Sequence, residues 1–152
     1  MLKLIPRHRN TTVGAASMPL VSRKGLLAIA AVIDVALHSG ARPVSAKALA
    51  ARHALPPRHL EPVLQALVRS GILRGIRGPQ GGYEMARDQS AITAEDILTA
   101  AGSAEEAEEP ALASDLVNAV VRPALEGAEH SFSLALRQIT VADMVRRAHR
   151  PA

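Results

Sequence analysis

The chain has 152 residues, of which 48% are hydrophobic, but it holds only one Tyr and one Phe. A core of Ala, Leu, Val and Ile favours helices over sheets. The absence of cysteine excludes disulfides, thiol nucleophiles and thiolate-bound metal clusters. The formal net charge of +4 is unevenly placed, because residues 19–88 carry ten basic and four acidic side chains whereas residues 89–126 carry one and eight. This asymmetry indicates either a polyanionic partner for the first region or two solvated surfaces.

The N-terminal segment and the hydropathy bear on localisation. No apolar run approaches the roughly 20 residues of a membrane span, and the first residues lack the apolar core of a signal peptide. We therefore expect a cytoplasmic protein without a membrane partner. Residues 1–18 are interpreted as a disordered tail, or else residues 1–17 are a segment ahead of a natural start at Met18.

Three helices are expected in the first half of the chain. Apolar side chains recur every three or four residues from Arg23 to Ser39. Ser45 is a typical N-cap for a short second helix, and a tight connection over residues 54–56 leads to a third helix from Pro57 to about Ser70. The expected inward side chains are Leu26, Ile29, Ala30, Ile33 and Leu37 in the first helix, and Leu60, Val63, Leu64 and Leu67 in the third.

A hairpin and a fourth helix follow. Residues 72–77 and 83–86 are typical of short strands, and the stretch GPQGG between them predicts a hairpin. Thr93 is expected to cap a helix over residues 94–101, with Asp96 in the capping-box position.

The C-terminal third is predicted as an acidic linker followed by helices. After the run EEAEEP, Pro110 is expected to open a helix that ends at Val121, and Pro123 to open a longer one. Thr140 is expected to cap a last short helix that ends at Arg147. The long helix carries a heptad-like apolar seam, which either packs on its own domain or pairs with a second copy. The seam residues are Leu125, Ala128, Phe132, Ala135, Leu136 and Ile139.

The order of helix, helix, tight turn, helix and glycine-rich hairpin is typical of a winged helix-turn-helix. In such a fold the third helix enters the major groove, and the hairpin, or wing, lies along the DNA backbone or minor groove. Arg58 can bind phosphate or guanine, Gln65 can reach adenine, and Glu61 can accept from a cytosine amino group. Each of these residues, like the neighbouring His59, could equally be a solvent-facing helix residue.

These residues also resemble a known family. The motifs SRKG, DVALHSG, PP-x-x-LE, RGP-x-GGY and QITVADMV are similar to those of the Rrf-two family of bacterial transcription regulators. The resemblance runs from Ser22 to Ala101 and returns near the C-terminus. It implies a homodimer that is joined by the long helix and binds a pseudo-palindromic operator in double-stranded DNA.

The combined prediction is a mainly α-helical protein with a small β-hairpin. Residues 19–101 would form the winged helix-turn-helix domain, residues 102–122 an acidic linker with a short helix, and residues 123–152 the dimerisation helix with a short C-terminal helix. The expected DNA-binding residues are Ser22, Arg23, Lys24, Pro57, Arg58, His59, Glu61, Gln65, Arg77, Gly78, Pro79, Gln80, Gly81, Gly82 and Tyr83.

The chain also departs from the family pattern. Leu26 and Leu27 replace an Arg-Tyr pair, Pro62 replaces a residue that is often Gln, and Gln80 replaces a frequent glycine. Sensing members carry three cysteines before the dimerisation helix, and this chain has none. An iron–sulfur cluster of the family's type is therefore excluded at that position, and we expect no cofactor and no metal.

Two other classes of protein are compatible with the composition. An enzyme is disfavoured, because the six histidines show no paired ligand spacing and the glutamates at 105, 106, 108 and 109 are typical of a solvated linker. The expected function is that of a repressor. The alternative is a winged-helix protein-interaction module, or a regulator controlled by a protein partner, with weak or lost specific DNA binding. A small-molecule or protein effector stays open for either.

Overall fold

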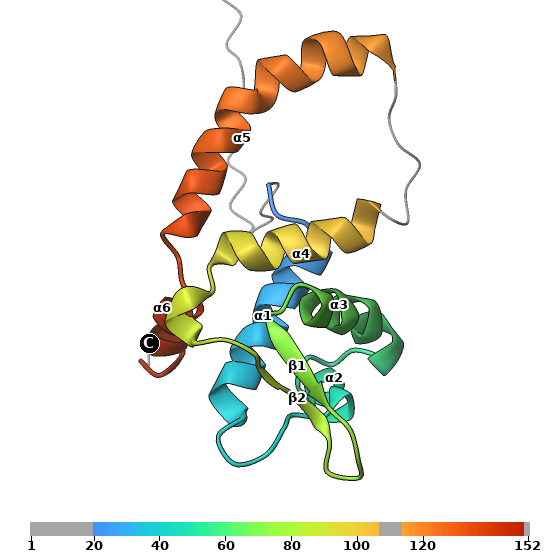
Figure 1. Ribbon diagram of the computed structural model, residues 1–152, viewed down its shortest axis with the longest axis vertical. Coiled ribbons are helices and arrows are strands. Elements are labelled where there is room, and N and C mark those ends of the chain that lie inside the picture. The colour runs from blue at the N-terminus through green and yellow to red at the C-terminus, as the bar shows by residue number, and fades with distance from the viewer. Residues whose placement is uncertain (1–19, 107–113, 151–152) are drawn as a thin grey trace, which may run out of the picture.

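The computed structural model describes residues 20–106 and 114–150. The predicted tail and Pro110 lie outside these residues. Figure 1 shows a helical body that holds the hairpin, with one long helix that rises away from it. The elements in chain order are α1 (Arg23–His38), α2 (Ala46–Arg52), α3 (Pro57–Arg69), β1 (Leu73–Ile76), β2 (Gly82–Met85), the 3-10 turn η1 (Gln89–Ala91), α4 (Ala94–Glu106), the π-helical turn η2 (Val117–Val121), α5 (Arg122–Arg137) and α6 (Val141–Ala148).

The bounds predicted for α1 are confirmed, but the predicted buried face is wrong. Leu26 is 41% exposed, and the other four expected core residues are only half-buried. The buried side chains are mainly small ones: Ala28, Ala31, Val32 and Val35. Helices α3, α4 and α6 and strand β2 all contact α1. Close approach from several directions requires small side chains on the central face, so the larger ones are placed at its edges.

Helices α2 and α3 form as predicted. The Ser45 hydroxyl accepts a hydrogen bond from the Ala48 N–H at 3.1 Å, which confirms the N-cap. Ala54 has a φ of 52° in the tight connection, and α3 begins at Pro57. Because Pro62 lies inside α3 without an N–H, the carbonyl of Arg58 loses its helical partner.

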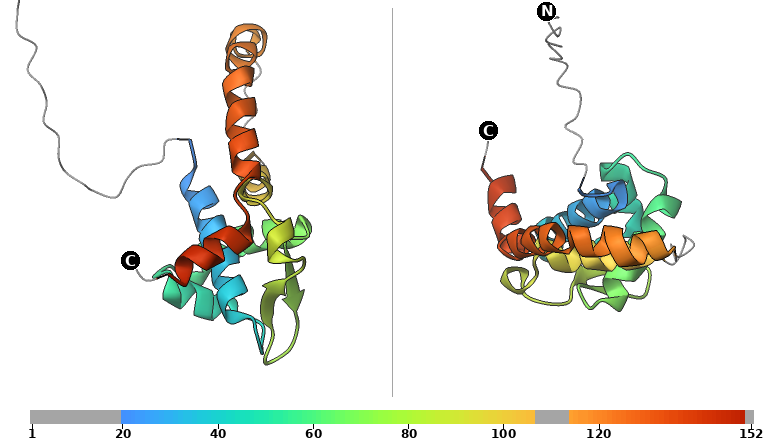
Figure 2. Two further views of the ribbon diagram at one scale, coloured as in Figure 1. Left: turned by 90° about the vertical axis from the view of Figure 1, so that its left-hand side faces the viewer. Right: turned by 90° about the horizontal axis from the view of Figure 1, so that it is seen from above.

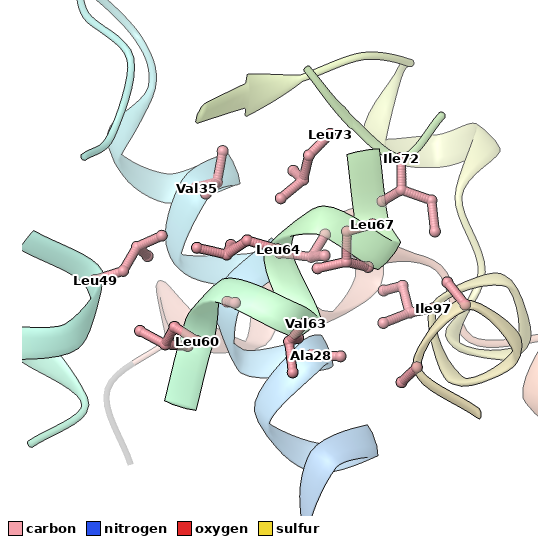
Figure 3. Close-up of a cluster of buried hydrophobic side chains, with 14 of the residues drawn as sticks. Ala28, Val35, Leu49, Leu60, Val63, Leu64, Leu67, Ile72, Leu73 and Ile97 are labelled. Carbon is pink, nitrogen blue, oxygen red and sulfur yellow. The ribbon is translucent and has the colours of Figure 1, made fainter. Parts of the chain in front are cut away.

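The core lies between α1, α3 and α4, as Figure 3 shows. The four predicted core residues of α3 are all buried, and Leu60, Leu64 and Leu67 are completely so. Leu49 from α2, Ile97 from α4 and Ile72 and Leu73 at the start of the hairpin join the same cluster. Local periodicity therefore predicted the buried face of α3 correctly.

The hairpin is antiparallel and is tied to the loop before α2. Arg74 pairs with Glu84 and Gly75 with Tyr83 in its register. Val44 and Tyr83 exchange two backbone hydrogen bonds of 2.8 Å, so Val44 forms an isolated antiparallel bridge with strand β2. This bridge fixes the hairpin against the N-terminal end of α2.

Helix α4 carries the predicted capping box but is longer than expected. The Thr93 N–H donates to Asp96 Oδ2 at 3.0 Å, and the Asp96 N–H donates to Thr93 Oγ1 at 3.2 Å. The helix continues past Ala101 to Glu106. The first residues of the predicted acidic linker are therefore helical.

The two helices predicted around Pro123 are one continuous helix in the described region. Residues 115–116, η2 and α5 follow without a break. A proline cannot donate to the carbonyl four residues earlier and clashes with it. The π turn directly before Pro123 relieves this conflict, so the proline does not start a new helix.

Helix α6 returns to the body. The predicted cap at Thr140 is confirmed and is part of a capping box, because Thr140 and Asp143 exchange hydrogen bonds of 3.0 and 3.1 Å. The chain on either side of Thr140 pairs with the start of α4: Ala94 N–H donates to the Ile139 carbonyl at 2.8 Å and Val141 N–H to the Ile92 carbonyl at 2.9 Å. Val141 is fully buried. In the described ranges, none of these helices is long and apolar enough to cross a membrane.

Candidate nucleic-acid interface

The solvent-facing side of α3 carries the residues predicted to read DNA. Pro57, Arg58, His59, Glu61 and Gln65 are all exposed, whereas the opposite side of the helix is buried in the core. No carboxylate of the described residues forms an ion pair with Arg58. The start of α3 therefore presents a guanidinium, a carboxylate, an imidazole and an amide group to solvent.

The tip of the hairpin is a tight turn built on glycine. The Gly81 N–H donates to the Gly78 carbonyl at 2.9 Å, with Pro79 in the second position of the turn. A Cβ atom on Gly81 would lie 2.1 Å from the Ile76 carbonyl oxygen, and one on Gly82 would lie 2.4 Å from that of Val44. Both positions exclude every residue but glycine on steric grounds.

The two arginines of the hairpin differ in what they contact. Arg74 Nε donates to Glu84 Oε1 at 2.9 Å across the two strands, so its charge is compensated. Arg77, at the root of the turn, is exposed and has no ion-pair partner among the residues that the structure describes. Only Arg77 presents an uncompensated charge on this hairpin.

Figure 1 shows the hairpin tip projecting at one end of the body, with α2 beside it. Ser45 and Ala46 at the start of α2 line a shallow hollow together with Arg77, Gly78 and Tyr83. Tyr83, which is among the expected DNA-binding residues, is half-buried and packs against the hydrophobic core.

Sequence reasoning missed two cations next to this surface. Arg42, in the loop before α2, is exposed and lines a second hollow with Pro79 and Gln80 of the hairpin tip. Lys47 is exposed in the first turn of α2. For Arg42, the only sequence signal was a basic residue in a short loop between helices. The proximity of Arg42 to the hairpin depends on the Val44–Tyr83 bridge.

The structure does not bring Ser22, Arg23 and Lys24 to the hairpin. The Ser22 hydroxyl accepts from the Gly25 N–H at 3.0 Å and caps α1. In Figure 1 and the side view of Figure 2, this end of α1 lies near α4, and the hairpin tip lies at the other end of the body. Any contact of these three residues with DNA must therefore be separate from that of the wing.

A buried carboxylate holds α2 against α1. Asp34 is 7% exposed, and Arg52 Nε lies 3.0 and 2.9 Å from its two oxygens. His38 Nδ1 and His53 Nε2 lie 3.1 and 3.0 Å from the same carboxylate. Burial raises the pKa of Asp34, but hydrogen bonds and charge from Arg52, together with the two histidines, outweigh it, so the pKa lies below its ordinary value.

The predicted apolar seam is divided between two environments. Phe132 and Leu136 are half-buried and line a hollow of about 340 Å³ with Leu98 of α4. Leu125, Ala128, Ala135 and Ile139 are exposed. Glu95 of α4 accepts hydrogen bonds from Ser133 and Arg137, which fixes the C-terminal half of α5 on the body. The N-terminal half has no buried residue.

Three helices, a tight turn before the third and a glycine-tipped hairpin define a winged helix-turn-helix protein. Residues 21–147 match the model of the Rrf2 family, which is described as an iron-dependent transcriptional regulator. The chain belongs to this family, the Rrf-two family that its motifs resemble. The relatives are transcriptional regulators rather than enzymes.

Two curated relatives and two solved structures place the chain within that family. Over 80 residues, 53% of this chain, it is 36% identical to the HTH-type transcriptional regulator IscR of Yersinia enterocolitica. The corresponding identity to IscR of Escherichia coli is 34% over 80 residues. Each alignment covers 49% of the relative, so the chain spans about half the length of the curated relatives it matches.

The structural similarity extends over more of the chain. The structure of T. potens IscR has a TM-score of 0.65 and 32% identity, and the match covers 87% of this chain and 92% of that one. The structure of CymR, the global cysteine regulator of B. subtilis, has a TM-score of 0.65 and 26% identity, with 84% and 96% covered. The likeness therefore includes the region beyond the hairpin.

The residues present do not fit an iron centre held by thiolates. The chain has no cysteine. In residues 20–106 and 114–150, no group of three or more His, Asp or Glu side chains is arranged to hold a metal ion. The iron dependence in the family description thus has no matching ligand set in the described part of this chain.

Proposed function

We propose that this protein is a cytoplasmic transcription regulator that binds double-stranded DNA as a homodimer and represses from a pseudo-palindromic operator. The observation that carries the proposal is the pairing of an exposed polar face on α3 with a glycine-tipped wing whose Arg77 is uncompensated. A cation that is exposed and unpaired keeps its full attraction for phosphate, because no competing carboxylate has to be displaced.

The parts of this surface would have different tasks. Arg77 and the peptide groups of Gly78–Tyr83 would contact phosphates or the minor groove, where a narrow groove favours arginine. Arg58, Glu61 and Gln65 would meet base edges in the major groove, and Pro57 and His59 flank them. Arg42 and Lys47 extend the cationic surface beside the wing and are added here to the proposed phosphate contacts.

The exposed part of the long helix supports a dimer. Leu116, Val120 and Leu125 are 66, 56 and 56% exposed. A helix that projects from the body with apolar side chains in water gains free energy by covering them. A second copy is the occupant we propose, with the N-terminal half of the helix as the main contact and Phe132 and Leu136 kept on their own body.

The control of binding would differ from that of cluster-dependent relatives. Without thiolates, iron–sulfur assembly at the position of the family's three cysteines is not available to this chain. We propose that the regulator acts without a cluster, through a small-molecule or protein effector.

The test is a binding measurement with a fluorescent duplex taken from upstream of the protein's own gene and a scrambled duplex of equal composition. We expect the first to bind at least about a thousandfold more tightly, and both affinities to fall steeply as salt rises. Equal affinity for the two duplexes at every salt concentration would instead support the protein-interaction module.

Two substitutions then test the proposed base contacts of α3. Arg58→Ala and Glu61→Gln should each change the preference between operator variants by about 1–3 kcal/mol. Arg87→Ala, at an exposed arginine that follows the hairpin, is the charge-matched control for Arg58→Ala and should leave the preference unchanged. If Arg58→Ala and Arg87→Ala have the same effect, α3 does not read sequence in the proposed way.

A further inference from the structure

Three arginines converge on the outer side of α6, away from the surface described above. Arg146, Arg147 and Arg150 are all exposed. They line a hollow of about 330 Å³ together with Gln138, Ile139 and Asp143. The hollow is therefore formed jointly by α6 and by the turn that connects it to α5.

The charges in this hollow are not balanced. Asp143 is the only carboxylate among the lining residues, and it accepts hydrogen bonds from the Thr140 backbone and from Arg146. The hydrogen bond from the Thr140 backbone is the largest cause that lowers the pKa of Asp143, so the carboxylate stays ionised at neutral pH. Three guanidinium groups against one carboxylate leave an excess of two positive charges.

The C-terminus of α6 stabilises only part of this excess positive charge. A helix C-terminus carries about half a negative elementary charge, which favours a cation in the last turn. Arg150, however, lies beyond the end of α6, in a turn where its N–H donates to the Arg147 carbonyl at 3.2 Å. It lines the same hollow as Arg146 and Arg147, so the three like charges repel one another. An arrangement that costs stability in the free protein gains it when an anion enters between the guanidinium groups.

The position of the hollow argues against a role in reading DNA. In Figure 1, α1 separates α6 from α3, and the view from above in Figure 2 also places α6 at the far edge of the body. None of the lining residues belongs to α3 or to the hairpin. A duplex lying on α3 and the wing would leave this hollow facing solvent.

We propose that the hollow binds a small molecule that carries a phosphoryl group, with a diphosphate as the best-matched group. The planar guanidinium fork donates two parallel hydrogen bonds to a phosphoryl oxygen pair. Arg147 and Arg150 supply such forks, and the Gln138 side chain supplies a neutral donor. Ile139 at the same rim offers an apolar contact to whatever the phosphoryl group is attached to. The site is independent of the proposed DNA binding.

The test is calorimetric titration of the full-length protein with inorganic pyrophosphate and with a nucleoside diphosphate, each against sodium chloride of equal ionic strength. The double variant Arg147→Gln/Arg150→Gln removes the two forks and keeps Arg146 with its partner Asp143. Arg69→Gln/Arg87→Gln removes two exposed arginines elsewhere and is the control for net charge. Unfolding curves of both variants establish that they are folded.

We expect saturable binding of both probes, weakened at least tenfold in Arg147→Gln/Arg150→Gln and unchanged in the control. Tighter binding of the nucleoside diphosphate than of pyrophosphate would locate part of the ligand on Ile139, and equal affinity would assign the site to the free anion. No heat beyond the chloride reference, or equal loss in the two double variants, overturns the proposal. A loss of duplex affinity in Arg147→Gln/Arg150→Gln without pyrophosphate binding would overturn it too, and would assign the patch to DNA.

Discussion

The body and the long helix of this protein are stabilised in different ways. All the buried hydrophobic residues of the described chain lie in the body, between Ala28 and Ala101 and at Val141. The helix from residue 115 to Arg137 has none, and its N-terminal half carries some of the most exposed apolar side chains. The body is thus stabilised by its own buried contacts, whereas the long helix has no buried residue of its own. We expect this difference to separate residues that determine folding from residues that determine the proposed dimerisation.

The largest expected effect is on the core. Leu64→Ala removes a completely buried side chain from the centre of α3 and should lower the free energy of unfolding by about 2–5 kcal/mol. The matched change Leu134→Ala, at a position on α5 that is 45% exposed, should alter it by less than about 0.5 kcal/mol. Urea unfolding at one protein concentration measures both, and a similar loss in the two variants would contradict the division between body and helix.

A smaller effect is expected at the junction of α1 and α2. Asp34→Asn keeps the shape of the side chain but removes the charge that faces Arg52, and should destabilise the body by about 1–3 kcal/mol at pH 7. The cost of breaking a buried pair is reduced here because Arg52 is 37% exposed.

The same substitution has a defined pH dependence. The pKa of Asp34 in the folded state lies below the ordinary value of 3.8. Its contribution is therefore complete above the unfolded-state pKa, and it is lost as the pH falls through the lowered folded-state pKa. Unfolding curves from pH 7 downward should show the wild type approaching Asp34→Asn only in the range below about pH 4. A difference that stays constant down to pH 2 would rule out the ion pair as its cause.

The next effect concerns assembly alone. Leu125→Glu places a charge in the exposed apolar part of the long helix and should raise the dimer dissociation constant at least about tenfold, or about 1.4 kcal/mol. The unfolding free energy of the body should not change. Sedimentation velocity over a range of concentrations measures the first quantity. An unchanged dimer, or a wild type that is monomeric at micromolar concentration, would show that this surface does not pair with a copy of itself.

The smallest effect distinguishes the two halves of the seam. Phe132→Ala removes a half-buried side chain that faces α4, and should lower the unfolding free energy by about 1 kcal/mol, less than a core truncation would. It should leave the dimer dissociation constant within a factor of about three. A stronger effect of Phe132→Ala than of Leu125→Glu on dimerisation would move the dimer contact to the C-terminal half.

Local sequence rules predicted the capped and turn-bounded elements well. The caps at Ser45, Thr93 and Thr140, the start of α3 at Pro57 and the hairpin each depend on residues within a few positions of one another. The buried face of α1 was missed because hydrophobicity ranks Leu and Ile above Ala, whereas close packing against several elements selects the smaller side chain.

The missed features of the candidate site depend on contacts distant in sequence. Arg52 is 18 residues from Asp34, and Arg42 meets the hairpin tip only because Val44 pairs with Tyr83. The charge of Arg74 is compensated and that of Arg77 is not, because the strand register places Glu84 opposite Arg74. The motif RGP-x-GGY predicted the wing, but only the register shows which arginine is uncompensated.

The proposed binding of duplex DNA by the wing and α3 depends on uncompensated charge, and the two hairpin arginines test this dependence most directly. Arg77→Ala and Arg74→Ala remove the same charge from the same hairpin, and affinity for the upstream duplex is measured for both at several salt concentrations. We expect Arg77→Ala to weaken binding by about 1–3 kcal/mol and to reduce the salt slope by about one, because one phosphate contact is lost. Arg74→Ala should change affinity by less than about 1 kcal/mol, since Glu84 already compensates that charge. Equal losses in the two variants, or an unchanged slope in Arg77→Ala, would contradict the account.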